Sequence, residues 1–276
     1  MERVSIDGVE HDPGDPRSAI PVSDHGITVG DGVFETLQIV DGAAFALSRH
    51  LDRLRRSARV VDLGPLPEPD TIRKWVGEIL RNGPQTGRLR LTVTAGDGPL
   101  SSARGEGPVR TILATSGLPA RRAESNLHIV PWTRNERGAL VGAKTTSYAE
   151  NVVALAAAAR TGADEALLLN NRGEICEGTG SNVFVVLDGR IHTPPLSSGC
   201  LAGITRELVG ELVTVEETTL TPADLDRAEE VFITSSTRDV QPVASVDDRL
   251  YPGRKGAVTA AVFHRFSELK ANRPDP

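Results

Sequence analysis

The sequence predicts a mixed α/β (α+β) protein of two domains. Stretches with strand-like alternation and stretches with the apolar spacing of amphipathic helices follow one another along all 276 residues. That length suits one large domain or two modest ones, and hydrophobic residues, at 39%, suffice for packed cores. Residues 116–124 form the candidate linker, so we expect a small N-terminal domain at 1–118 and a larger domain at 119–276.

In the first domain, a central strand and the helix after it carry the clearest patterns. The run 33–40 precedes the tight turn Asp41-Gly42, which predicts a hairpin strand. Apolar residues then recur at helical spacing, with Ser48 as the expected N-terminal cap and Arg53 on the opposite, polar face. The other expected elements are a hairpin near 4–9, a loop marked by Pro13, Pro16 and Pro21, a helix from 70 or 71 to the Asn82 region, strands at 88–94 and 109–115, and a long loop at 95–108.

The second domain is expected to be rich in strands, with two clear helices. An alanine-rich segment at 150–160 is closed by Gly162, the residue type that commonly ends helices, and an amphipathic helix covers 256–272. The other expected elements are strands at 127–131, 166–169, 182–187, 214–220, 231–235 and 240–246, a polar loop at 133–138, a helix from 201 to about 212 and a helical turn at 222–227.

Composition excludes several classes of function. The net charge of −6 is spread along the chain in both signs, so we expect no nucleic acid and no anionic membrane as partner. The absence of an N-terminal signal and of any apolar run near ~18 residues predicts a cytoplasmic protein. Cys176 and Cys200 are the only cysteines, too few for a disulfide framework or a zinc site.

Lys144 is the first candidate for chemistry. Lysine occurs at only four positions in this arginine-rich chain, and Lys144 lies among small residues between Gly142 and Tyr148. A lysine in this setting is either an ordinary surface residue or a Schiff-base nucleophile, because burial lowers the pKa of an amine and arginine cannot replace it.

Glu177 is the second candidate, at the start of the glycine-rich stretch 177–182. The carboxylate either belongs to an ordinary turn or faces a pyridine nitrogen, which it would keep protonated as an electron sink. The glycines precede a strand and not a helix, which argues against a dinucleotide fingerprint.

A possible anion site is the third signal. The segment Gly203-Ile204-Thr205 opens a helix, whose first amides are suited to phosphate. Ser235 and Ser236 form a second turn rich in donors, and Arg53 could add a charged clamp. Each feature alone is common in caps and turns; together they describe a phosphate cup.

Two other site types fit the sequence poorly. There is no Gly-x-Ser-x-Gly elbow for a serine hydrolase, and the histidines lie in unrelated contexts. No histidine and carboxylate cluster has the spacing of metal ligands, so we expect no metal.

Taken in order, these motifs resemble the class IV, fold type IV pyridoxal-phosphate enzymes. That family includes D-amino-acid and branched-chain aminotransferases, (R)-amine transaminases and aminodeoxychorismate lyases. The resemblance implies a small N-terminal α/β domain and a larger C-terminal pseudo-barrel domain. The matching segments, which span most of the chain, are 30–36, 50–58, Lys144, 177–184, 201–206 and 234–243.

The resemblance implies a role for each matching residue. Lys144 would form the Schiff base with pyridoxal 5'-phosphate and carry the proton, and Glu177 would pair with the pyridine nitrogen. Tyr148 could hydrogen-bond the 3-oxygen of the cofactor. The residues implied to hold the phosphate are Arg53, Ile204, Thr205, Ser235 and Ser236.

The same comparison leaves the substrate open. The family's D-amino-acid enzymes trap the substrate carboxylate with a tyrosine where Phe34 stands and with an Arg-x-His where Leu100 and Ser102 stand. That trap is absent, and our hypothesis is that an arginine replaces it. The candidates, one of which could come from a partner subunit, are Arg88, Arg90 and Arg104.

We therefore expect a homodimeric transaminase that moves an amino group between an amino acid and a 2-oxo acid. The form Gly-Asp-Gly-Val-Phe-Glu-Thr at 30–36 favours the D-amino-acid and lyase branches. The substrate is expected to be a D-amino acid or an (R)-amine. The alternatives are 4-amino-4-deoxychorismate lyase and a branched-chain aminotransferase.

Overall fold

The structure is a computed structural model, and it describes residues 2–12, 14–15, 19–81, 83–118, 120 and 122–276. Pro13, Pro16 and Asn82, which mark a loop and a helix end in the sequence, lie outside the described residues. The chain forms two compact units. Unit 1 comprises Met1–Pro119, Ala143–Tyr148 and Arg273–Pro276, and unit 2 comprises Ala120–Gly142 and Ala149–Asn272.

Unit 1 places Lys144 with the N-terminal part of the chain, although it is distant in sequence. The predicted boundary between 1–118 and 119–276 falls at Pro119, which is not among the described residues. The division into these two domains therefore stays a prediction.

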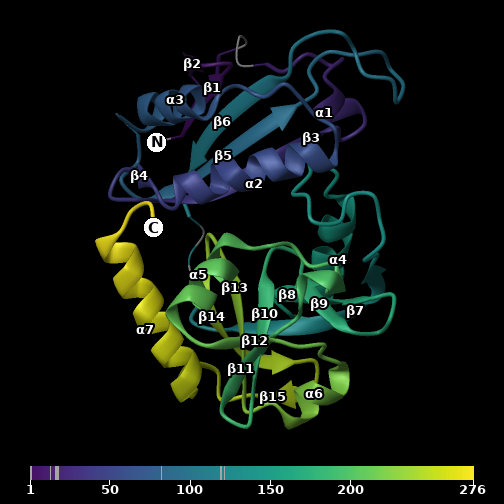
Figure 1. Ribbon diagram of the computed structural model, residues 1–276, viewed down its shortest axis with the longest axis vertical. Helices are drawn as coiled ribbons and strands as arrows, with labels where there is room; N and C mark the ends of the chain where they lie inside the picture. The colour runs from purple at the N-terminus through teal and green to yellow at the C-terminus, as the bar shows by residue number, and fades with distance from the viewer. Residues whose placement is uncertain (1, 13, 16–18, 82, 119, 121) are drawn as a thin grey trace. The chain divides into compact units, whose positions relative to one another are not determined.

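Unit 1 is built on an antiparallel sheet with the strand order β2-β1-β6-β5-β3-β4 (Figure 1). Its strands are β1 (Arg3–Ile6), β2 (Val9–His11), β3 (Gly32–Val40), β4 (Ala43–Ala44), β5 (Gly87–Thr94) and β6 (Arg110–Ser116). Its helices are α1 (His25–Thr28), α2 (Leu47–Val60) and α3 (Pro69–Arg81). The helical turn α1 was not predicted, because four residues carry no periodic signal.

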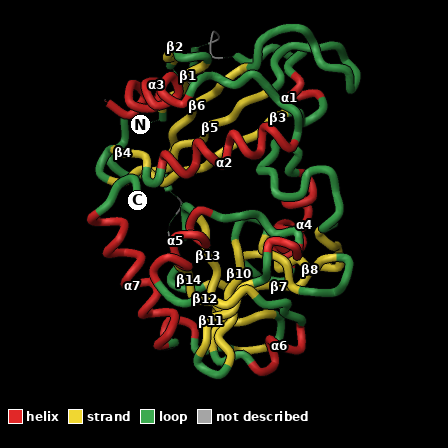
Figure 2. Tube along the Cα trace, in the orientation of Figure 1, coloured by secondary structure: helices red, strands yellow, loops and turns green. Residues whose placement is uncertain are grey.

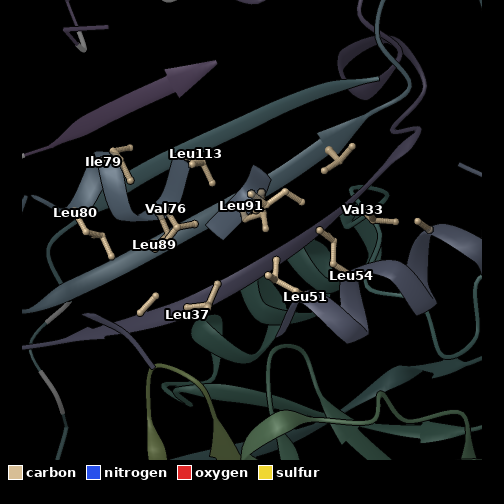
Figure 3. Close-up of a cluster of buried hydrophobic side chains, with 14 of the residues drawn as sticks. Val33, Leu37, Leu51, Leu54, Val76, Ile79, Leu80, Leu89, Leu91 and Leu113 are labelled. Atoms are coloured by element: carbon tan, nitrogen blue, oxygen red, sulfur yellow. The ribbon is translucent and has the colours of Figure 1, made fainter. Parts of the chain in front are cut away.

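The core of unit 1 lies between one face of this sheet and the helices α2 and α3. Figure 3 shows Leu37 and Leu91 from the strands meeting Leu51, Leu54 and Val76 from the two helices. Each of these side chains is at most 2% exposed. Burying one such side chain stabilises the fold by about 1.5–3 kcal/mol. Alternate side chains of β5 point into this core, so the polar side chains between them lie on the opposite face of the sheet.

Two expectations for α2 were wrong. Ser48 does not cap the helix: the N-cap is Ala46, in a left-handed conformation, and the Ser48 hydroxyl hydrogen-bonds the carboxylate of Asp275 near the C-terminus. Arg53 was placed on the polar face, but it is 4% exposed. A buried partner, described below, explains why this arginine turns inward.

Unit 2 is built on a nine-stranded mixed sheet, counted over the described residues, with the main path β12-β11-β10-β13-β14-β7-β8-β9 and with β15 beside β14. Figure 2 shows strands in yellow and helices in red. Its strands are β7 (Ser125–Arg134), β8 (Glu165–Asn170), β9 (Ile175–Gly178), β10 (Asn182–Leu187), β11 (Arg190–Thr193), β12 (Val215–Glu217), β13 (Glu230–Ser235), β14 (Asp239–Val246) and β15 (Arg249–Leu250). Its helices are α4 (Ala149–Arg160), α5 (Ile204–Leu212), α6 (Pro222–Arg227) and α7 (Ala257–Asn272), with 3-10 turns at Leu196–Ser198 and Gly253–Lys255.

The structure corrects three expectations in unit 2. Glu177 lies not in a turn but on the short strand β9, where it pairs with Leu168 of β8. Strand β7 continues through Thr133 and Arg134, which the sequence had assigned to a loop. The helix expected from Leu201 begins three residues later, at Ile204.

The mixed α/β class is confirmed, because helices and strands follow one another in both units. None of the helices in the described part of the chain is long and apolar enough to cross a membrane. The described residues also contain no group of three or more histidine, cysteine or acidic side chains placed to hold a metal ion.

Candidate active site

The backbone around Lys144 is tied to the beginning of β3. The amide of Phe34 donates to the carbonyl of Lys144 at 2.9 Å, and the amide of Thr146 donates to the carbonyl of Gly32 at 2.8 Å. The amide of Lys144 donates to the hydroxyl of Ser57 on α2 at 3.0 Å. The segment thus extends the sheet at its end, and three hydrogen bonds fix where the lysine side chain starts.

The side chain of Lys144 lies against two aromatic rings. Its Nζ is 4.5 Å from the ring centroid of Phe34 and 5.4 Å from that of Tyr148. The two rings meet edge to face, with centroids 5.2 Å apart. Ring faces attract a cation and exclude water from one side of it. The structure therefore brings together Phe34, Lys144 and Tyr148, all singled out from the sequence.

Arg53 forms a buried charge cluster with Glu35 and His50. Its Nε donates to Oε1 of Glu35 at 2.8 Å and its Nη2 donates to Oε2 at 2.5 Å. Nδ1 of His50 lies 2.6 Å from the same Oε2. All three residues are at most 4% exposed. Charge-assisted pairs of this bidentate kind fix the guanidinium plane.

The cluster shifts the pKa values of two of its members. Burial alone would raise the pKa of Glu35, but the charge and hydrogen bonds of Arg53, with those of His50, lower it from 4.5 to about 2. Burial lowers the pKa of His50 from 6.5, against the opposing effect of Glu35. We therefore assign Glu35 as a carboxylate and His50 as a neutral imidazole near pH 7.

The three arginines proposed to bind substrate lie in different surroundings. Arg90 Cζ lies 3.3 Å from the centroid of Phe34. Arg88 donates to the hydroxyl of Ser116 at 2.8 Å. Arg104 donates to both carboxylate oxygens of Asp31, at 2.7 and 2.8 Å, and these hydrogen bonds lower the pKa of Asp31. Of the three, Arg90 lies against the ring of Phe34, which also contacts Lys144.

In unit 2, an ion pair and a backbone hydrogen bond hold the carboxylate of Glu177. Arg134 Nε lies 3.2 Å from Oε1, and the amide of Leu201 donates to Oε2 at 2.9 Å. Glu177 is 9% exposed. Arg134 also donates to Asn151 at the beginning of α4. Each oxygen thus has a partner within unit 2. Arg134 was missed because β7 extends further than its apolar run.

The beginning of α5 is a buried donor site. Ile204 and Thr205 are 2% and 4% exposed, and no side chain caps the helix. Among the described residues, neither of their amides donates a hydrogen bond. A β-carbon added at Gly203 would lie 2.0 Å from Oδ1 of Asn182, so glycine is needed for this close approach. First amides of a helix that lack partners suit a phosphate group.

The strand next to this helix adds a buried hydroxyl. Thr234 pairs across the sheet with Asn182, and its hydroxyl has no hydrogen-bond partner within the described residues. Ser235 ends β13, and its hydroxyl accepts from the amide of Arg238 at 3.2 Å. Ser236 follows in the turn and is half-buried. The helix α5 packs on β13, so these hydroxyls belong to the same part of unit 2 as Ile204 and Thr205.

A second buried carboxylate shapes the glycine-rich loop after Glu177. Glu165 is fully buried and accepts from the amide of Thr179 at 3.0 Å, from the hydroxyl of Ser181 at 3.2 Å and from Arg238 at 2.7 Å. It ties the loop to the turn after β13. Its signal in the sequence is faint, because a single glutamate before an apolar run is common at strand starts.

Comparison with known proteins gives the family. The family model described as Amino-transferase class IV matches residues 32–246. The chain belongs to the class IV aminotransferases. Enzymes of this class use pyridoxal phosphate as cofactor.

Relatives of this class IV aminotransferase carry two kinds of name. It is 32% identical over 263 residues to a putative branched-chain-amino-acid aminotransferase of Methanocaldococcus jannaschii, and the match covers 91% of each chain. It is 30% identical over 274 residues to a D-alanine aminotransferase of Listeria innocua, again covering 91% of each chain. It also resembles the PLP-bound form of a hypothetical aminotransferase from Mycobacterium tuberculosis, with TM-score 0.84, 26% identity and coverage of 97% and 98%.

The donor set of this aminotransferase fits pyridoxal phosphate. The cofactor needs an amine for its aldehyde, an acceptor for its ring nitrogen and several donors for its phosphate. Lys144 in unit 1 has the chemistry of the first, and Glu177 in unit 2 has that of the second. The amides of Ile204 and Thr205 and the unpartnered hydroxyl of Thr234 have the chemistry of the third.

Proposed function

We propose that this aminotransferase moves an amino group between D-amino acids and 2-oxo acids, with Lys144 as the catalytic residue. The observation that carries the proposal is the position of the ε-amine of Lys144, against the rings of Phe34 and Tyr148 and on a backbone fixed by hydrogen bonds. The D-configuration is supported by the relatives named D-alanine aminotransferase in Listeria, Bacillus and Staphylococcus.

In this proposal Lys144 has two tasks. Its Nζ would hold the cofactor through the aldehyde until the substrate amine takes its place there, and the released amine would carry the proton that leaves or joins the substrate Cα. Pyridoxal phosphate, when bound, supplies an electron sink for the bonds at that carbon. The two aromatic rings replace part of the hydration of the amine.

Glu177 is proposed to accept a hydrogen bond from the pyridine nitrogen. Arg134 and the amide of Leu201 hold its two oxygens, so the carboxylate keeps one orientation while the chemistry proceeds. Arg134 is therefore a positioning residue in this proposal. The hydroxyl of Tyr148 is proposed to hydrogen-bond the 3-oxygen of the cofactor.

The phosphate is proposed to lie at the amides of Ile204 and Thr205, with the hydroxyls of Ser235 and Ser236 and the guanidinium of Arg53. Removing Arg53 should weaken cofactor retention by about 1.5–3 kcal/mol, the range for a hydrogen bond to a charged group. Dialysis of Arg53→Lys and Arg53→Ala against cofactor-free buffer measures this. Retention equal to the wild-type chain in both variants would remove Arg53 from the phosphate site.

A second candidate substrate class is the branched-chain L-amino acids. It is favoured by the relative from Methanocaldococcus jannaschii, which carries that name at 32% identity. The two candidates differ in which face of the substrate meets Lys144, so they are separated by stereochemistry and not by the reaction type.

The decisive experiment is a panel of amino donors with 2-oxoglutarate and chiral analysis of the products. We expect D-alanine and other D-amino acids to convert, with (R)-1-phenylethylamine as a slower donor. Conversion of L-leucine alone would establish the branched-chain alternative. No transfer with any donor, but release of pyruvate from 4-amino-4-deoxychorismate, would establish a lyase.

We further propose that the protein is a cytoplasmic homodimer, as the composition and the resemblance suggested. Both cysteines are free and buried, which suits a reducing compartment. Light scattering of the holoenzyme tests the assembly: a mass near twice 29.4 kDa is expected, and a monomer at assay concentration would refute it.

A further inference from the structure

Arg90 is a partly buried cation with an unusual set of contacts. Its guanidinium carbon lies 3.3 Å from the centroid of Phe34, so the planar group is stacked on the ring. Its Nε donates to the hydroxyl of Thr92 on the same strand face at 3.2 Å. Within the described ranges, its two terminal nitrogens donate no hydrogen bond and the residue makes no ion pair.

This lack of a counter-charge is costly for the free protein. Removing an ion from water without a partner is unfavourable, and burial accordingly lowers the pKa of Arg90 to about 10. The group remains protonated near neutral pH. An anion that reaches the two terminal nitrogens would recover the lost solvation through a bidentate pair.

Neither of the two other candidate arginines combines unused terminal donors with a contact to the ring of Phe34. Arg104 makes a bidentate pair with Asp31 and also donates to the carbonyl of Val61 at 2.7 Å. Arg88 donates to Ser116, two positions along the strand from Arg90 and away from Phe34. A ligand anion would have to replace existing hydrogen bonds at Arg104, whereas Arg90 offers its own unused donors.

The ring of Phe34 links Arg90 to the catalytic amine. The Nζ of Lys144 is 4.5 Å from the same centroid over which Arg90 is stacked. The guanidinium carbon of Arg90 and Nζ of Lys144 are therefore separated by at most the sum of these two distances to the centroid. A 2-amino acid requires an amine-binding group and a carboxylate-binding group close together, because one carbon separates its amine from its carboxylate.

We infer that Arg90 binds the carboxylate of the amino acid and of the 2-oxo acid, with Phe34 holding the guanidinium plane in place. This inference rests on the proposed function, because it takes Lys144 as the amine that meets the substrate. It assigns the substrate class as 2-amino acids with a free carboxylate. Amines without that group have no partner for Arg90 and leave its charge uncompensated.

The test compares Arg90→Gln with the wild-type holoenzyme. Calorimetry with 4-methylpentanoate, a carboxylate without an amine, should show a Kd raised roughly 10- to 150-fold, as for a lost charge-assisted pair. The KM for D-alanine should rise by a similar factor with a smaller change in kcat. The rate with (R)-1-phenylethylamine should change less than about threefold, which a merely structural role would not produce.

Three further variants complete the experiment. Arg90→Lys keeps the charge but not the bidentate geometry, so it should fall between wild type and Arg90→Gln, and it also serves if Arg90→Gln does not fold. Arg56→Gln removes an exposed arginine of α2 and should leave every constant unchanged. A larger loss of carboxylate binding in Arg88→Gln or Arg104→Gln would overturn the assignment.

The outcomes separate this inference from the proposed function. If the wild-type chain transfers no amino group, the proposed function fails, and the calorimetric Kd still decides the role of Arg90. If the wild-type chain transfers amino groups and Arg90→Gln binds 4-methylpentanoate as tightly as it does, the inference about Arg90 fails alone. No binding of 4-methylpentanoate by the wild-type chain would also overturn it.

Discussion

The carboxylate of Glu35 on β3 and the guanidinium of Arg53 on α2 form a buried bidentate ion pair, with hydrogen bonds of 2.8 and 2.5 Å. It lies on the face of the sheet that packs against α2, among otherwise apolar neighbours. His50 completes the cluster, one helical turn before Arg53. The pair fixes the one arginine for which the resemblance implies contact with the cofactor phosphate.

Glu35→Ala should destabilise the protein by about 3–5 kcal/mol, because it leaves the guanidinium of Arg53 buried without its counter-charge. Urea unfolding measures this as a lower midpoint. The matched control is Arg55→Ala, which breaks an exposed pair with Glu68 and should cost less than about 1 kcal/mol. Equal losses in the two variants would show that burial of the first pair has no energetic consequence.

Stability should fall as the pH is lowered from 7 toward 3. The pKa of Glu35 is about 2 in the folded state and 4.5 ordinarily, so the folded state binds fewer protons than the unfolded state. The free energy of unfolding therefore falls by about 3 kcal/mol as the pH is lowered from 4.5 through about 2. The lowered pKa of His50 acts in the same direction from 6.5 downward. Urea midpoints at pH 7, 5.5 and 4 should show a steeper loss for wild type than for Glu35→Gln/His50→Gln. Parallel curves would contradict the assignment.

Lys144→Ala should lower the rate of amino transfer by at least about 10³-fold, because no other group replaces the tether and the proton carrier. The fold should persist, since the backbone hydrogen bonds of this segment remain. Borohydride reduction followed by mass spectrometry should find cofactor on position 144 in the wild-type chain and none in the variant. Lys74→Ala, on an exposed face of α3, is the control. Substantial turnover by Lys144→Ala would refute the catalytic role.

Gly203→Ala should impair the beginning of α5. The new β-carbon would lie 2.0 Å from Oδ1 of Asn182, so the helix start must shift, at a cost of about 1–3 kcal/mol. Cofactor retention should fall with stability if the amides of Ile204 and Thr205 hold the phosphate. Gly210→Ala on the same helix has no atom within 4 Å and should be neutral or stabilising by up to about 1 kcal/mol. Unchanged thermal unfolding and retention in Gly203→Ala would contradict the phosphate site.

The sequence patterns predicted regular elements well where the apolar period was strong. The alternation in β3 and β5 and the helical spacing in α2 and α7 all appear in the structure. Short or mixed segments were the ones missed or misplaced, such as α1, β9 and the end of β7. The hydrogen bonds of β9 and of the end of β7 come from distant partners, of which a local pattern carries no record, and α1 is too short to show a period.

Among the candidate site residues, local sequence singled out the groups proposed to carry chemistry and missed the residues that pair with them. Glu35 stands at an inward position of β3, between Val33 and Leu37, which is a readable signal of a buried charge. Its partner Arg53 was nevertheless assigned to the polar face, because helical spacing alone cannot tell which arginine has a buried carboxylate opposite it. Arg134 behind Glu177 gave no local signal at all.

By itself the sequence determined the class of the protein and its cofactor and singled out Lys144 as the candidate amine, because each depends on residue types in a fixed order. Only the tertiary structure decided which charges are paired: Arg53 with Glu35, Arg104 with Asp31, and Arg90 with no anion among the described residues. The physical reason is that charge pairing depends on burial and on groups far apart in the chain, and both are set when the sheet and its helices pack together.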